Sequence, residues 1–284
     1  MSELFTPDAY EGRPVAVAVD GSDFARDAAD WAAGEALRGG RRLRVLTVAD
    51  SASDEDAFDL LDEIETRLVK AHPGLVVERD ALVGDPVREL EAVSRESALL
   101  VVGSRGRGGF AGLLLGSVSF HLAAHAHCPL VVVPRSHAAA AHRGPSVVGV
   151  DDEHDCTQVL RYALDHAEGA GGGLRVVHAW APYPLHDSTY ISDTDITARH
   201  AQERIAAWLK AAHAEQYRVR AETAVVRGDP AKVLVEQSRD ADLVVVGAHR
   251  GRLPRTGRIG PILHELLLAA RCPVAIVPLV WSAE

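Results

Sequence analysis

One glycine-rich segment in the first half of the chain has the residue types and spacing of a phosphate-binding loop. Gly103-Ser104-Arg105-Gly106 is followed, after nine residues, by Gly116-Ser117, where a helix is expected to begin. Glycines let a ligand approach the main chain closely, and the unpaired N–H groups at a helix start attract an anion. Because Arg105 and Arg107 add positive charge, the segment predicts a site for the phosphates of a nucleotide.

A second residue with suggestive chemistry, Asp20, directly follows the first apolar run of the chain. Its carboxylate has the wrong sign for phosphates. It can instead accept a hydrogen bond from a ribose hydroxyl or an amino group. Asp20 and the glycine segment are therefore expected to hold opposite ends of one nucleotide.

The elements that must position these residues alternate between strand and helix. Short, continuously apolar strands are typical of a parallel sheet with helices on both faces, joined by right-handed crossovers. Such doubly wound sheets bind ligands at the carboxyl ends of strands where the strand order reverses, here after the first and fourth strands. We predict strands at 15–19, 43–48, 76–83, 99–102 and 130–133, and helices at 24–37, 57–71, 86–96 and about 117–127.

The second half of the chain repeats the first. An offset of 144 residues carries Gly84-Asp85-Pro86 onto Gly228-Asp229-Pro230, and Cys128-Pro129 onto Cys272-Pro273. Nearer the start of each half the offset is 131, which predicts an inserted loop within 182–197. A register this regular indicates a tandem duplication. This duplication and a predicted linker at 135–145 divide the chain into domains 1–140 and 141–284.

Composition excludes several classes of function. Lys and Arg number 30 against 40 Asp and Glu, for a net charge of −10, which disfavours nucleic acid as a partner. No apolar run reaches the roughly 18 to 20 residues of a membrane span, and residues 1–11 lack the pattern of a secretory signal. The sparse, odd set of cysteines indicates reduced thiols rather than disulfides; these are Cys128, Cys156 and Cys272. We therefore expect a cytoplasmic protein with no nucleic-acid or membrane partner.

Together these features resemble the universal stress protein family in its tandem form. The resemblance runs nearly end to end and rests on Val15 to Asp20, Thr47-Val48, Gly84-Asp85-Pro86, Leu99 to Ser117 and Cys128 to Pro134. It implies two α/β units, each a doubly wound parallel five-stranded sheet in the order 3-2-1-4-5 with helices on both faces. It also implies that the two units pair through their last strands, 130–133 and 274–277, as an internal pseudo-dimer.

The resemblance further implies ATP as the ligand, with or without Mg²⁺. Val48 would contribute its backbone, and Asp20 would hold the adenosine with it. The remaining first-half residues would line the ribose and phosphates: Gly103, Arg105, Gly106, Gly116, Ser117 and Val118. The corresponding second-half set is Asp151, Ala179, Gly247 and Gly260.

The second half departs from this pattern. Arg250 replaces the second glycine, with Gly251 adjacent, and Pro261 replaces the serine. Proline has neither an N–H nor a hydroxyl, so two phosphate donors are lost. The first half is therefore expected to be the main nucleotide site, and ATP binding by the second half is left open.

Several functions fit these observations. The first is a regulatory, ATP-binding sensor of the stress response with little or no turnover, in which no residue is catalytic. The second is a slow ATPase or nucleotidyl-transfer enzyme, and the third is a ligand-free scaffold. The chain has no P-loop motif and no Gly-x-Gly-x-x-Gly after its first strand, and no positioned general base is evident. His121 and His125 share a helix face without a motif to complete a site, so no metal is predicted. A homodimer and an unidentified protein partner stay open.

Overall fold

The computed structural model describes residues 10–106, 115–135, 144–151, 154–181, 194–250 and 259–280. Within these residues the first half follows the predicted alternation of strand and helix. Its elements are β1 (Val15–Ala18), α1 (Asp23–Arg38), β2 (Leu43–Ala49), α2 (Glu55–Ala71), β3 (Val77–Val83), α3 (Pro86–Ser94), β4 (Leu99–Gly103), α4 (Ser117–His125) and β5 (Leu130–Val133).

The second half repeats this order, with a short 3₁₀ helix, η2 (Ala214–Gln216), added before its third strand. Its strands and α-helices are β6 (Ser146–Val150), α5 (Thr157–Ala170), β7 (Leu174–Trp180), α6 (Thr194–Ala211), β8 (Ala221–Arg227), α7 (Pro230–Gln237), β9 (Leu243–Arg250), α8 (Pro261–Ala269) and β10 (Val274–Val280). Among the helices described, none is long and apolar enough to span a membrane.

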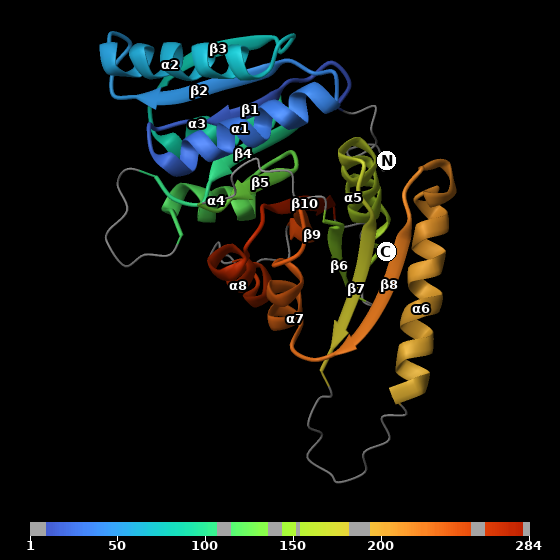
Figure 1. Ribbon diagram of the computed structural model, residues 1–284. Coiled ribbons are helices and arrows are strands. Elements are labelled where there is room, and N and C mark those ends of the chain that lie inside the picture. The colour runs from blue at the N-terminus through green and yellow to red at the C-terminus, as the bar shows by residue number, and fades with distance from the viewer. Residues whose placement is uncertain are drawn as a thin grey trace.

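All these strands belong to one sheet, in the order β3-β2-β1-β4-β5-β10-β9-β6-β7-β8. Each half is parallel and has the predicted 3-2-1-4-5 order. The halves join where β5 and β10 pair antiparallel, with Val132 opposite Val274 and Leu130 opposite Ile276. Figure 1 shows the two halves meeting at these strands. The fold and the pairing through the last strands are therefore confirmed, and the pairing covers two edges that would otherwise be exposed.

Two apolar layers hold the helices on the sheet. Helices α1, α2, α5 and α6 bury side chains on one face, and α3, α4, α7 and α8 bury theirs on the other. The alanines that predicted α1 lie on its buried face, where small side chains let the helix approach the sheet closely. They are Ala25, Ala28, Ala29, Ala32 and Ala36.

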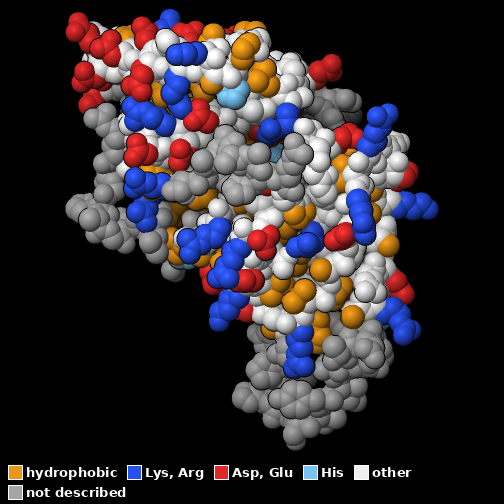
Figure 2. Space-filling model, viewed as in Figure 1, with side chains coloured by type: hydrophobic (Ala, Val, Ile, Leu, Met, Phe, Trp, Pro, Cys, Tyr) orange, Lys and Arg blue, Asp and Glu red, His pale blue; other side chains and the backbone are white. Residues whose placement is uncertain are grey.

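The outermost strands differ from the continuously apolar pattern expected of a buried parallel sheet. Strand β3 carries Glu78, Arg79 and Asp80, and none of its side chains is fully buried. A strand that is paired on one side and charged along its length is protected from pairing with another chain. Figure 2 shows acidic side chains gathered at the end of the molecule that α2 and β3 form.

Two second-half elements extend beyond the sequence prediction. Helix α6 begins at Thr194, so the loop expected within 182–197 ends earlier. Ser, Thr and Asp are favoured at the starts of helices as well as in loops, so the composition of this segment did not mark where the helix begins. Strand β10 continues through Pro278 to Val280 because it keeps pairing with β9 after its pairing with β5 has ended. Residues 136–143 of the expected linker and 182–193 of the expected loop lie outside the described part of the chain.

Candidate functional site

The turn that follows β1 holds Asp20 in place. Gly21 has φ of +81°, a left-handed conformation that glycine adopts without strain. Ser22 caps α1 by accepting a hydrogen bond from the Ala25 N–H at 3.2 Å. The Asp20 Oδ1 atom accepts from the Ser22 N–H at 3.0 Å. The carboxylate therefore stands at the carboxyl end of β1 with its orientation fixed by the backbone.

Gly106 lies directly against Asp20. A Cβ atom at position 106 would overlap Asp20 Oδ2. The structure thus brings together two predicted residues that are far apart in the sequence, at the edge where β1 and β4 both end. It also gives a physical reason for glycine at this position, since any other residue would displace the carboxylate.

Helix packing gives Gly103 a reason to lack a side chain, in addition to the reason that the sequence suggested. A Cβ atom here would lie 2.8 Å from both the carbonyl carbon and the oxygen of Phe24. The missing side chain therefore makes room for the first turn of α1, which packs across β4.

The start of α4 is tied to the end of β4. The Gly116 N–H donates to the Ser104 carbonyl at 2.9 Å, and Ser119 Oγ donates to the Gly103 carbonyl at 2.7 Å. Gly116 is the N-cap of α4 and provides no side-chain cap. Because Gly116 has no side chain that could accept from the first-turn N–H groups, these groups are suited to an anionic ligand. Residues 107–114, including Arg107, lie outside the described residues.

Two arginines bring positive charge to this edge of the sheet. The guanidinium carbons of Arg105 and Arg135 each lie 5.8 Å from the centre of the Phe24 ring. Arg135 also approaches Asp23, with 3.5 Å between Nη2 and Oδ2. Sequence reasoning had singled out Arg105 but missed Arg135 and Phe24. The signal was available, since Arg135 follows the strand that neighbours β4.

The other predicted first-half residues surround the same edge. Val48 lies on β2, two residues beyond Leu46, the last residue that pairs with β1. Val118 lies in the first turn of α4, and both valine side chains pack, partly buried, against the same apolar layer. Ser117 opens α4 and is exposed.

In the second half, all four predicted residues line one cavity of about 450 Å³. Asp151, Ala179, Gly247 and Gly260 are among its walls. The Asp151 carboxylate is engaged locally, because its Oδ1 accepts from the His154 N–H and lies 2.9 Å from His154 Nδ1.

The backbone at this second edge also differs from that of the first half. Strand β9 continues over Ala248–Arg250, pairing with β10 up to Val280, at the positions where the first half turns toward Asp20. Gly247 would place a Cβ atom 2.7 Å from Leu279 Cδ1, a side-chain contact, whereas Gly103 faces backbone.

The histidines and cysteines that the sequence singled out pack against neighbouring side chains. His121 Nε2 and His127 Nε2 each lie 3.5 Å from the Glu91 carboxylate. Within the described residues, no group of three or more His, Cys, Asp or Glu side chains could hold a metal ion. The three cysteines are buried, and no disulfide joins them. Burial raises the pKa of the Cys156 and Cys272 thiols to about 12.

The fold and this edge define a tandem, doubly wound α/β protein whose candidate site lies at the carboxyl ends of β1 and β4. The universal stress protein family model matches residues 12–134 and 145–278, and the chain belongs to that family. One universal stress protein of Mycobacterium tuberculosis is 30% identical, over 92% of this chain and 94% of its own. A second from the same species is 34% identical, over 77% of this chain and 73% of its own.

A solved structure supports the fold. The crystal structure of a universal stress protein from Archaeoglobus fulgidus has a TM-score of 0.67 at 19% identity. The match covers 95% of this chain and 99% of that one, so the tandem arrangement of the whole molecule is similar.

Proposed function

We propose that the first half binds ATP at the carboxyl ends of β1 and β4. We further propose that the protein is a regulatory sensor of the stress response with little or no turnover. The observation that carries the binding site is the meeting of Asp20 with Gly106 beside the start of α4. The regulatory role rests on membership of the universal stress protein family.

The chemistry of this edge fits the two ends of ATP. The Asp20 carboxylate would accept from the ribose hydroxyls. Val48 lies on β2 beyond the end of its pairing with β1, where its backbone would meet the base. The first-turn N–H groups of α4 and the guanidinium of Arg105 suit the phosphates, because both carry positive charge toward an anion. Any Mg²⁺ would enter the site as a complex with the phosphates of ATP.

Calorimetric titration with ATP tests the site. We expect one equivalent of ATP per chain and, for Asp20→Asn, an affinity about tenfold lower, since a neutral amide makes weaker hydrogen bonds than a carboxylate. The asparagine keeps the shape of the side chain and an oxygen for the Ser22 N–H. The matched control is Asp151→Asn in the second half, which should bind ATP as the wild type does. Equal affinities for wild type and Asp20→Asn would contradict the site.

A second pair of variants exchanges the residue that distinguishes the two halves. Gly106→Arg gives the first half the residue of the second, and Arg250→Gly makes the reverse change. The first should abolish ATP binding because its side chain occupies the space of Asp20, and the second should leave it unchanged. Overnight incubation of the wild type with ATP, followed by nucleotide chromatography, separates a sensor from a slow ATPase. Release of more than one equivalent of ADP per chain would favour the slow ATPase.

A further inference from the structure

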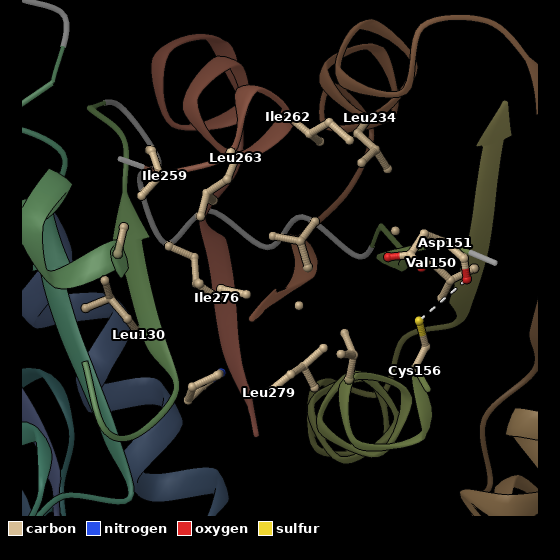
Figure 3. Close-up of a pocket in the computed structure, with 18 of the residues that line it drawn as sticks. Leu130, Val150, Asp151, Cys156, Leu234, Ile259, Ile262, Leu263, Ile276 and Leu279 are labelled. Carbon is tan, nitrogen blue, oxygen red and sulfur yellow. Dashed lines mark hydrogen bonds between the residues drawn. The ribbon is translucent and has the colours of Figure 1, made fainter. Parts of the chain in front are cut away.

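The cavity of the second half extends between the two halves of the molecule. It is bounded by α5, α7, α8 and β10 of the second half and by α4 and β5 of the first. Figure 3 shows apolar side chains from these elements directed toward a common space. They include Leu130, Leu234, Ile259, Leu263, Ile276 and Leu279.

Polar residues of the first-half site are replaced by apolar ones around this cavity. The repeat offset of 144 residues pairs each first-half position with one in the second half. The second-half counterparts all line the cavity. In the first half, Ser119 Oγ donates to the Gly103 carbonyl and Arg135 supplies positive charge. The replacements are Ser104 by Ala248, Ser117 by Pro261, Ser119 by Leu263 and Arg135 by Leu279.

Among the residues that the structure describes around this cavity, the polar side chains do not suit a phosphate. Asp151 is negatively charged and exposed, and its carboxylate is engaged by His154. The Cys156 Sγ lies 3.6 Å from the His154 carbonyl, to which it donates. Moving an ion into such surroundings is unfavourable unless an opposite charge accompanies it. The described side chains of the lining therefore disfavour an anion.

We propose that the second-half crevice binds a small, uncharged and mainly apolar molecule instead of a nucleotide. Its volume of about 450 Å³ lies within the range of small-molecule sites, which are lined mainly by apolar side chains with few polar groups. Walls from both halves and from several elements enclose the space, which suits a compact molecule better than an extended protein segment.

Titration of the full chain with N-phenyl-1-naphthylamine, a neutral apolar probe that fluoresces in apolar surroundings, tests the proposal. We expect saturable binding of one equivalent per chain that excess ATP does not displace. Ala248→Phe places a large side chain in the cavity and should weaken probe binding by about tenfold or more. The matched control, Ala71→Phe, makes the same change at an exposed position at the end of α2 and should bind as the wild type does.

A second filling variant, Ala179→Phe, covers the case in which Ala248→Phe fails to fold. Thermal unfolding of each variant shows that a loss of binding is not a loss of structure. Absence of saturable probe binding, or unchanged affinity in a folded filling variant, would overturn the proposal. Displacement of the probe by ATP would overturn it as well, because a nucleotide would then occupy this crevice. Loss of ATP binding at the first half alone would leave it standing.

Discussion

Replacing Gly103 with alanine is expected to destabilise the first half, whereas the same change at Gly116 is not. An alanine Cβ at position 103 would lie 2.8 Å from the backbone carbon and oxygen of Phe24 and 2.9 Å from its Cβ. Carbon atoms in contact prefer a separation of roughly 3.5 to 4.0 Å. Helix α1 would therefore have to move away from β4 by about 0.6 Å or more.

This displacement of α1 sets the expected loss of folding stability. Overpacking a core typically costs about 1 to 3 kcal/mol. Gly→Ala changes return roughly 0.4 to 1 kcal/mol by reducing the freedom of the unfolded chain. The net loss for Gly103→Ala is then about 1 to 2 kcal/mol, or a fall in Tm of roughly 4 °C for a chain of this size. At Gly116 the nearest atoms to an added Cβ are 3.5 to 3.6 Å away, so Gly116→Ala should stay within about 1 kcal/mol of the wild type.

Gly247→Ala, at the position equivalent to 103 in the second half, provides the matched comparison. Its added Cβ meets Leu279 Cδ1 at 2.7 Å and Val159 Cγ2 at 3.1 Å, and both are side-chain ends that can rotate away. It should cost less than Gly103→Ala. Urea unfolding monitored by circular dichroism measures all three. If Gly103→Ala were as stable as the wild type, or Gly116→Ala lost as much, the assignment of this glycine to helix packing would be refuted.

Two further predictions concern titratable groups. Burial raises the pKa of Glu35, but His166, with Nε2 3.2 Å away across the two halves, and Arg38 lower it to below the usual 4.5. The carboxylate therefore stabilises the fold above pH 4.5, and this stability is lost as the pH falls through the folded pKa. Glu35→Gln should cost about 1.5 to 3 kcal/mol at pH 7, and its Tm should fall less than that of the wild type on acidification; parallel acid titrations of Tm would disprove the linkage. Because the pKa of Cys156 and Cys272 is about 12, the native protein should resist Ellman's reagent at neutral pH, and urea should expose all 3 thiols. Rapid labelling of the native chain would contradict their burial.

Much of the fold could be predicted because local signals agreed with one another. The inner strands were short apolar runs, and helices α1, α2, α3 and α7 began beside a side chain that caps them. Asp85 and Asp229 each precede the proline that opens a helix, and they accept from the N–H groups of Arg88 and Lys232 at 3.0 and 3.2 Å. The strand order followed from the family resemblance, which depends on the same motifs in both halves.

Sequence reasoning reached its limit where a property depended on contacts between distant segments. It recognised that Gly103 must be bare, but the atom that requires this belongs to Phe24 on α1. It noted Arg250 in place of a glycine, but the extension of β9 depends on its partner strand β10. Periodicity also gives no information on a cavity whose walls come from both halves of the chain.

Helix α4 connects the two candidate sites and gives the duplication a physical consequence. Its first residue, Ser117, stands at the proposed ATP site, and Leu122 and Ala126, further along the chain, line the cavity of the second half. The antiparallel pairing of β5 and β10 places the second half's crevice beside this helix. A chain with two identical nucleotide sites would need polar groups at both edges. The replacement of Ser119 by Leu263 and Arg135 by Leu279 instead lets the second edge join an apolar region between the halves. On these two proposals, divergence of the repeat gives two chemically different sites that share one helix, and any coupling between their ligands must be reciprocal.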